Sequence, residues 1–180
     1  YYQVLQAANA KEGLRCAINS TPDFILSDVM MPVMDGLALL KELRNTPATS
    51  HIPVVFLTAR TDEATELRAY DYGAEAFMIK PFSAKVLRSR IKTILSERQR
   101  LYRSFMDRPV ASAATGKAPK LTTLDEQFMQ KIRTEIEKHI ADSDYTVEEL
   151  IATMPMSRTV LVKKLKSLTG QSPIEFMRYI

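Results

Sequence analysis

Cysteine and long apolar runs are both scarce in this chain of 180 residues. It has one cysteine, Cys16, and no apolar run near the roughly 20 residues that a membrane-spanning helix needs. A single cysteine excludes a disulfide framework within the chain and is typical of a reducing compartment. The N-terminus lacks a signal-peptide pattern. We therefore expect a cytoplasmic location, with a membrane anchor only if a longer parent protein supplies one.

A strong charge of one sign is also lacking. The formal net charge is +4, which does not by itself indicate nucleic-acid binding. The composition, 46% hydrophobic and 26% charged, is typical of a globular protein with room for two small domains. The chain does not begin with methionine, and its last residues lie within a helical pattern. We expect it to be a fragment.

Residues 24–36 form the most informative stretch. A short apolar run ends on Asp28, a turn with Pro32 follows, and Asp35-Gly36 opens a predicted helix. A short apolar run between turn signals is typical of a buried parallel strand. Ligands and chemistry gather beyond the carboxyl ends of such strands. Asp28 is therefore a candidate functional carboxylate, although a solvated strand end explains Asp28 equally well if it stands alone.

Strands and helices alternate through the first half of the chain. Strands are predicted at residues 2–7, 24–28, 53–58 and 76–80, with helices between and after them. This alternation favours a parallel sheet with right-handed crossovers. The sequence therefore predicts an α/β first half.

Three of the predicted strands end on polar side chains of different chemistry: Asp28, Thr58 and Lys80. Parallel strands end at one edge of a sheet, so we expect these groups to converge. A carboxylate can act as a nucleophile, a hydroxyl can donate to oxygens of a transferred group, and an ammonium attracts an anion. The pattern predicts a site for a transferable anion. The alternative is that Lys80 only forms a structural ion pair with Asp28.

These residues belong to a set of motifs that resembles the receiver domain of two-component response regulators. The resemblance runs from Tyr2 to about Glu97. The motifs occur in the same order and at similar separations as in that family: Asp28, Met31-Pro32, Met34-Asp35-Gly36, Leu57-Thr58-Ala59, Gly73-Ala74 and Lys80-Pro81-Phe82.

The resemblance implies a flavodoxin-like fold and a role for each site residue. Asp28 would accept a phosphoryl group from a histidine kinase, with the help of bound Mg²⁺. Thr58 and Lys80 would contact the phosphoryl group. Phe77 would be the switch aromatic that turns inward when Thr58 moves, and Pro81 is the candidate for a cis peptide bond.

The sequence departs from the family at its beginning. The first strand with its acidic pair, and the first helix, are missing from the chain. The expected metal ligands are therefore only Asp28 and the backbone carbonyl near Met30, whereas Mg²⁺ prefers several oxygen ligands. We expect this truncated receiver, residues 1–107, to be a poor phosphoacceptor.

The second half has a different organisation. Residues 108–120 are small, polar and flanked by prolines, which is typical of a linker. Residues 121–180 show an all-α pattern. Helix starts are indicated by Thr146 with Glu149, by Ser157, and by Ser172 with Glu175. A short helix, a turn and the helix after Ser157 predict a helix-turn-helix.

The helix after Ser157 presents a basic outer face that includes Arg158, Thr159, Val162, Lys163 and Lys166. Between residues 157 and 168 there are four basic residues and no acidic one. Over residues 121–180, by contrast, eight Lys and Arg stand against nine Asp and Glu. Such concentration suits contact with phosphates. A solvated basic face is the alternative.

The second half resembles the first helix-turn-helix of AraC-type transcriptional activators. The motifs that carry this resemblance are Met156–Leu161, Lys164-Leu165-Lys166, Leu168–Pro173 and Phe176–Ile180. The resemblance implies that Arg158, Thr159 and Val162 meet base edges and that Lys163 and Lys166 meet phosphates. The second such motif of that family is missing from the chain, so we expect weak, salt-sensitive DNA binding.

Together these features predict a phosphorylation-dependent transcription regulator with a histidine kinase and double-stranded DNA as partners. We expect it to dimerise when phosphorylated. A receiver with an AraC-type output also follows the kinase in hybrid sensor histidine kinases, so the parent could be such a protein. No complete catalytic centre lies in this segment. One alternative is a protein-docking module whose receiver does not cycle. An aspartate-nucleophile phosphatase is disfavoured, because Met30 stands where such enzymes place a second carboxylate.

Overall fold

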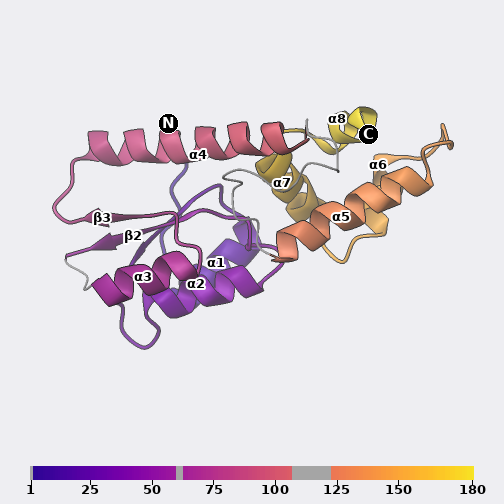
Figure 1. Cartoon of the computed structure of the whole chain (residues 1–180). Helices are drawn as coiled ribbons and strands as arrows, with labels where there is room; N and C mark the ends of the chain where they lie inside the picture. The colour runs from indigo at the N-terminus through magenta and orange to yellow at the C-terminus, as the bar shows by residue number, and fades with distance from the viewer. Residues whose placement is uncertain (1, 60–62, 107–122) are drawn as a thin grey trace. The chain divides into compact units, whose positions relative to one another are not determined.

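The structure is a computed structural model that describes residues 2–59, 63–106 and 123–180 (Figure 1). The chain divides into two compact units, Tyr1–Ile94 and Leu95–Ile180. The predicted linker, residues 108–120, lies outside the described residues. The domain limits 1–107 and 121–180 therefore stay predictions.

The first unit is built on a three-stranded parallel sheet. Its strands are β1 (Ile25–Asp28), β2 (Val54–Thr58) and β3 (Ala76–Ile79), in the order β1-β2-β3. Asp28 pairs with Leu57, and Thr58 pairs with Ile79. This register brings the carboxyl ends of all three strands to one edge, as the alternation of strands and helices predicted.

Helices cover both faces of the sheet (Figure 1). On one face lie α1 (Ala10–Ser20), α2 (Gly36–Asn45) and α3 (Glu63–Asp71), which share a buried cluster with Val54 and Phe56. On the other face lies the first part of α4 (Ala84–Met106). Its residue Ile94 packs with Val55 and Met78.

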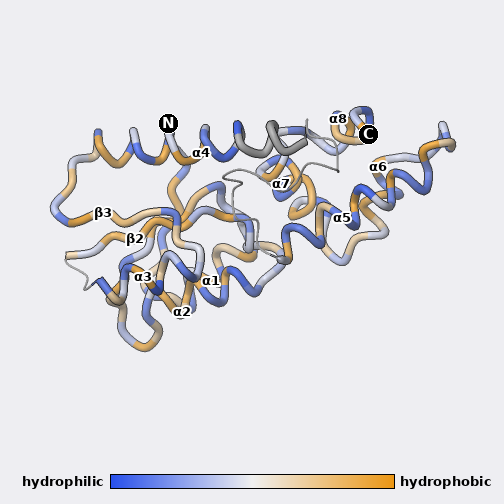
Figure 2. The backbone as a smooth tube through the Cα atoms, in the orientation of Figure 1, coloured by the Kyte–Doolittle hydropathy of each residue, from blue (hydrophilic) through white to orange (hydrophobic). Residues whose placement is uncertain are grey.

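The middle strand explains why the sequence shows a continuous apolar run there. Val54 and Phe56 pack on the side of α1–α3, whereas Val55 belongs to the cluster on the side of α4. A parallel strand covered on both faces buries successive side chains, so its sequence does not alternate. Figure 2 shows the hydrophobic colouring along β2 and β3.

The strand predicted over residues 2–7 is wrong. These residues form no regular element, and the side chains of Tyr2, Val4 and Leu5 are exposed. A strand is stabilised by hydrogen bonds to a neighbouring strand. Among the described residues, the ladder of the sheet contains only β1, β2 and β3, so residues 2–7 have no strand partner.

The start of α2 is held against the end of β1. The Asp35 carboxylate caps the helix by accepting a hydrogen bond from the Ala38 N–H at 2.7 Å. The Gly36 N–H donates to the Val29 carbonyl. A Cβ on Gly36 would clash with the Asp28 carbonyl and lie 2.7 Å from Cε1 of buried Phe56. Close approach of two backbones thus explains the glycine after Asp35.

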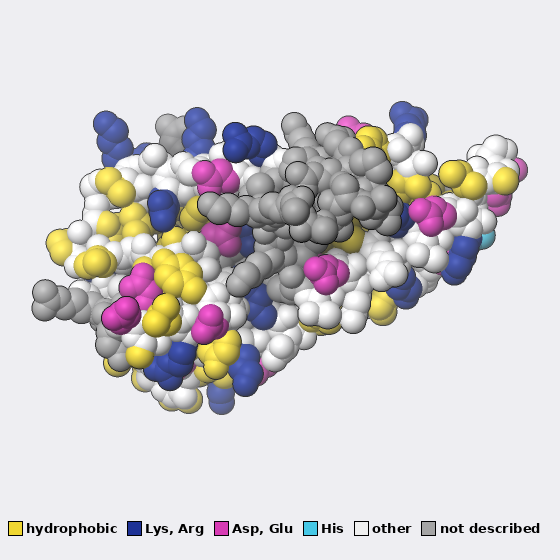
Figure 3. Space-filling view, viewed as in Figure 1, with side chains coloured by type: hydrophobic (Ala, Val, Ile, Leu, Met, Phe, Trp, Pro, Cys, Tyr) yellow, Lys and Arg dark blue, Asp and Glu magenta, His cyan; other side chains and the backbone are white. Residues whose placement is uncertain are grey.

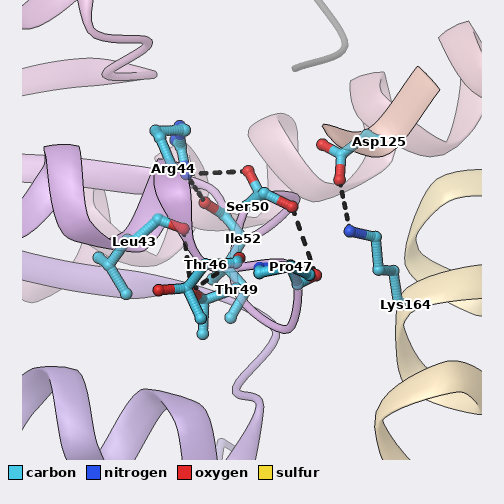
Figure 4. A network of polar contacts seen from close by, with 9 residues as sticks. All are labelled: Leu43, Arg44, Thr46, Pro47, Thr49, Ser50, Ile52, Asp125 and Lys164. Carbon is cyan, nitrogen blue, oxygen red and sulfur yellow. Dashed lines mark hydrogen bonds and ion pairs between the residues drawn. The ribbon is translucent and has the colours of Figure 1, made fainter. Parts of the chain in front are cut away.

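At the amino ends of the strands, one arginine joins two loops, and Figure 4 shows its contacts with the loop before β2. Arg44, at the end of α2, donates from Nη1 to the carbonyls of Ser50 and Ile52 and from Nη2 to the carbonyl of Gly73. Gly73 has a φ of 86°. The planar guanidinium suits several acceptors at once, and this fixes the loops before β2 and β3.

The second unit contains α5 (Thr123–Lys138), α6 (Val147–Ala152), α7 (Arg158–Thr169) and α8 (Pro173–Tyr179), together with the later part of α4. Apolar side chains of α5–α8 form one buried cluster, which includes Phe128, Leu150, Leu161 and Phe176. Among the described residues, no helix is both long and apolar enough to span a membrane.

Substitution of Gly36 by alanine tests the close packing at the end of β1. We expect Gly36→Ala to lower the free energy of unfolding of the first unit by roughly 1–3 kcal/mol, because the added methyl group overpacks a backbone contact. Urea unfolding followed by circular dichroism measures this change. Gly13→Ala in α1 is the control, since the nearest atom to a Cβ at that position, Cβ of Ala7, is 3.8 Å away. Destabilisation of the control by as much as Gly36→Ala would contradict the explanation.

Candidate functional site

The three predicted site residues lie at the carboxyl edge of the sheet. Asp28 is the last residue of β1, Thr58 is the last residue of β2, and Lys80 directly follows β3. Lys80 Nζ lies 2.6 Å from Asp28 Oδ2, although the two residues are 52 positions apart in sequence. The ammonium therefore reaches from the outer strand β3, past the end of β2, to the carboxylate on β1.

Hydrogen bonds hold the Asp28 carboxylate in its ionised form. The pKa of Asp28 is lowered chiefly by the hydrogen bond from Lys80, partly opposed by burial, and a bond from the Met30 N–H to Oδ1 at 3.3 Å adds to the lowering. The Asp28 and Lys80 side chains are 37% and 41% exposed. The carboxylate is therefore charged at neutral pH and still open to a reactant.

Thr58 contributes a hydroxyl that, unlike the Asp28 and Lys80 side chains, is buried. The residue is only 2% exposed, and its Oγ1 has no hydrogen-bond partner among the described residues. A buried hydroxyl without a hydrogen-bond partner lowers the stability of the fold, so its presence at this position requires an explanation. The carbonyl of Thr58 accepts a hydrogen bond from the Lys80 N–H at 2.7 Å, which joins the ends of β2 and β3.

Phe77, the predicted switch residue, lies in β3 beside other aromatic rings. It is half-buried, with its ring centroid 5.5 Å from that of Phe56 and 5.4 Å from that of Tyr70. Burial raises the pKa of Tyr70, with Glu66 adding to this effect. The peptide bond between Lys80 and Pro81 is cis.

The described residues offer only part of the oxygen ligands that Mg²⁺ prefers. Mg²⁺ binds through several oxygen ligands in near-octahedral geometry. Among the described residues, no three His, Cys, Asp or Glu side chains are grouped so that they could hold a metal ion. Both oxygens of Asp28 already accept hydrogen bonds, from Lys80 and from Met30.

In the second unit, the predicted DNA-contacting residues lie on α7. Arg158, Thr159, Lys163 and Lys166 are exposed, and Val162 is half-buried. Arg158 is the first residue of the helix, which begins after the cap Ser157. These five side chains lie outside the buried face of α7, so a partner could reach them.

The fourth basic residue of α7 does not belong to this face. Lys164 is fully buried, and its Nζ lies 2.7 Å from Asp125 Oδ1 (Figure 4). The same Nζ stands 4.9 Å from the centre of the Phe128 ring. Burial lowers the pKa of the Lys164 ammonium, and the carboxylate of Asp125 opposes that shift. Lys164 therefore links α7 to α5, and the sequence count of four basic residues overstates the exposed charge.

The sequence contained a signal for this burial that we did not use. Lys164 falls on the same helical stripe as Leu161, Leu165 and Leu168, which the period of the apolar residues places inward. Its partner could not be identified in this way, because Asp125 lies 39 positions earlier, on α5.

The fold and the strand-end residues define a class, the phosphoryl-accepting receiver domains of two-component signalling. The response regulator receiver domain family matches residues 1–92 of the 180, and the chain belongs to this family. Receiver domains interact with histidine kinases and bind Mg²⁺ in their active sites.

Three similar proteins illustrate the range of this family. "Histidine kinase P4" from Formosa agariphila is 35% identical over 179 residues, which are 99% of this chain and 13% of that protein. "Response regulator PleD" from Caulobacter vibrioides is 37% identical over 94 residues, 52% of this chain and 21% of that protein. The structure of chemotaxis protein CheY4 from Vibrio cholerae is similar with a TM-score of 0.50 and 32% identity, covering 52% of this chain and 78% of that one. The chain thus spans only a small part of the curated relatives.

Removal of the lysine tests the electrostatics of this site. In Lys80→Gln we expect the pKa of Asp28 to rise toward its ordinary value, because the main cause of its lowering is lost. The depressed pKa stabilises the fold above the unfolded-state value, and this contribution disappears as the pH falls through the folded-state pKa. NMR titration of the Asp28 carboxyl measures the change. Lys85→Gln, an exposed lysine of α4, should leave that pKa unaltered, and equal pKa values in both variants would contradict the assignment.

Proposed function

We propose that this chain is the receiver and part of the output of a phosphorylation-dependent transcription regulator. Asp28 accepts the phosphoryl group, and the α7 surface binds double-stranded DNA. The observation that carries the first half of this proposal is the 2.6 Å contact of Asp28 with Lys80 at the edge where β2 ends on Thr58, whose buried hydroxyl has no partner among the described residues. Almost the whole of this chain aligns with a small part of a histidine kinase, 99% of the chain with 13% of that protein. This supports a hybrid kinase as the parent, with its kinase module elsewhere in the parent.

The chemistry is a phosphoryl transfer to a carboxylate. An Asp28 oxygen attacks the phosphorus of a phosphohistidine, the P–O bond of an acyl phosphate forms, and the P–N bond breaks with its electron pair passing to the imidazole. The lowered pKa of Asp28 keeps the attacking carboxylate ionised at neutral pH. Lys80 then exchanges its carboxylate partner for the transferred phosphoryl oxygens.

Thr58 couples phosphorylation of Asp28 to a conformational change at β3. Its buried hydroxyl lacks a partner among the described residues, and a phosphoryl oxygen at Asp28 would offer one. Movement of Thr58 toward that oxygen leaves space beside β3. Phe77, which is half-buried against Phe56 and Tyr70, turns into this space and changes the outer surface of β3.

The changed surface adjoins an apolar face suited to a second copy of the chain. Exposed hydrophobic side chains gather over α3 and β3 (Figure 3). They include Leu67 of α3 and Ile79 of β3, which are 57% and 66% exposed, together with Val86 of α4. Dimerisation through this face would bring two DNA-binding units together and raise their effective concentration at DNA.

For DNA binding, the second unit offers a helix that follows a short helix and a turn. α6 and α7 are separated by residues 153–157, and α7 exposes Arg158, Lys163 and Lys166. In a helix-turn-helix the second helix enters the major groove with its N-terminal residues at base edges. We assign Arg158, Thr159 and Val162 to base edges, and Lys163 and Lys166 to phosphates.

Phosphorylation of the chain by acetyl phosphate tests the receiver half. With Mg²⁺ present we expect slow labelling by one phosphoryl group, seen by intact mass, and its loss in Asp28→Asn. Asp35→Asn is the matched control, because asparagine also caps helices and Asp35 lies only seven positions away. Labelling of Asp28→Asn at the rate of the unaltered chain would contradict the proposal.

The same variant separates this proposal from a protein-docking module. In the full-length parent, Asp28→Asn should abolish signal-dependent DNA binding, measured by footprinting with and without the kinase signal. Signal-dependent binding that survives Asp28→Asn would favour a receiver that docks proteins without cycling.

The phosphate-contacting role of Lys166 predicts a change in salt dependence. Lys166→Gln should weaken binding to all duplexes alike and reduce the slope of log affinity against log salt by about one. Fluorescence anisotropy at several salt concentrations gives this slope. Lys131→Gln removes an exposed charge from α5 and should leave the slope unaltered. A slope unchanged in Lys166→Gln would remove Lys166 from the interface.

A further inference from the structure

A carboxylate stands within the basic surface of α7. Glu148, in the first turn of α6, places Oε1 2.7 Å from Nη1 of Arg158, the first residue of α7. Both side chains are 64% exposed. The pair joins the two helices across the turn between them, and it puts a negative charge where phosphates would approach.

Folding does not require a charge at Glu148. The adjacent Glu149 forms the capping box of α6, accepting hydrogen bonds from the N–H and hydroxyl of Thr146. Glu148 has no part in that cap. An ion pair this exposed contributes little to stability, because water competes for both groups. The position of Glu148 therefore calls for another explanation.

The pair changes which DNA groups Arg158 can contact. Arg158 opposite a carboxylate carries little net charge toward a phosphate, and Glu148 repels the phosphate itself. Base edges in the major groove are different, since guanine offers two acceptors to a guanidinium and cytosine offers an N–H donor to a carboxylate. Arg158 retains further N–H donors beyond the one that Glu148 engages.

We propose that Glu148 is a specificity-determining residue: it orients the Arg158 guanidinium toward a G·C base pair and keeps it from the phosphates. This inference rests on the proposed DNA binding by α7. Glu148 acts partly through Arg158, as a positioning residue, and partly by accepting from cytosine. Lys163 and Lys166, which stand further along α7, supply the sequence-independent attraction.

The test uses the 180-residue chain and a pool of random DNA duplexes, with bound sequences determined by sequencing. The unaltered chain should enrich a G·C pair at one position. In Glu148→Gln we expect this preference to fall by roughly tenfold, since one bidentate contact is worth about that factor or more. Total affinity for the unselected pool should rise and its salt slope should steepen by up to about one, because Arg158 becomes free to meet phosphates.

Glu149→Gln is the matched control. It removes the same charge from the same helical turn, and glutamine also completes a capping box. It should raise affinity slightly through charge alone and leave the G·C preference unchanged. Arg158→Lys keeps the positive charge and removes the guanidinium, so it should lose the preference as Glu148→Gln does. Circular dichroism of each variant checks that its helices are intact.

Three results would overturn the inference. Glu148→Gln could match Glu149→Gln in both preference and salt slope, or it could weaken binding to all sequences equally. The unaltered chain could also bind the pool with no base preference, which leaves the proposed DNA binding standing. Failure of the unaltered chain to bind DNA at all would instead overturn the proposed function, and the inference with it.

Discussion

The parallel register of β1, β2 and β3 is the constraint on which the first unit depends. Parallel strands end at one edge, so three side chains that are far apart in the sequence, Asp28, Thr58 and Lys80, lie at that edge. The 2.6 Å contact between Asp28 and Lys80 spans the end of β2 and requires all three strands to be in register. Gly36 at this edge and Arg44 at the opposite edge both keep backbone segments close to the strands.

Exposure distinguishes three ion pairs among the described residues, Lys164 with Asp125, Asp28 with Lys80, and Glu148 with Arg158. Lys164 and Asp125 are buried, so their pair belongs to the packing of α5 against α7, and loss of one partner would leave a buried charge. Asp28 with Lys80, and Glu148 with Arg158, are open to water. Such pairs exchange partners readily, because water and an incoming anion or base compete on similar terms. Exposed ion pairs therefore suit a surface at which an incoming anion or base replaces one partner of the pair.

Much of the site could be predicted from the sequence because strand ends and helix starts leave local marks. Asp28, Thr58 and Lys80 each follow a short apolar run, and the capping boxes of Thr146 with Glu149 and Ser172 with Glu175 are confirmed. The prediction for residues 2–7 is wrong because a strand depends on more than local sequence. Their composition suits a strand, but a strand also needs a neighbour, and local composition does not reveal one.

Local periodicity and the geometry of crossovers were enough to predict β1, β2 and β3, their parallel arrangement and the residues at the carboxyl edge of the sheet. The pairing of charges, by contrast, depends on how these elements pack in three dimensions. Lys164 with Asp125, Arg158 with Glu148, and Arg44 with three carbonyls are all contacts between elements. Their partners lie between 6 and 39 positions away, and their choice depends on how helices and loops pack, which no local pattern records.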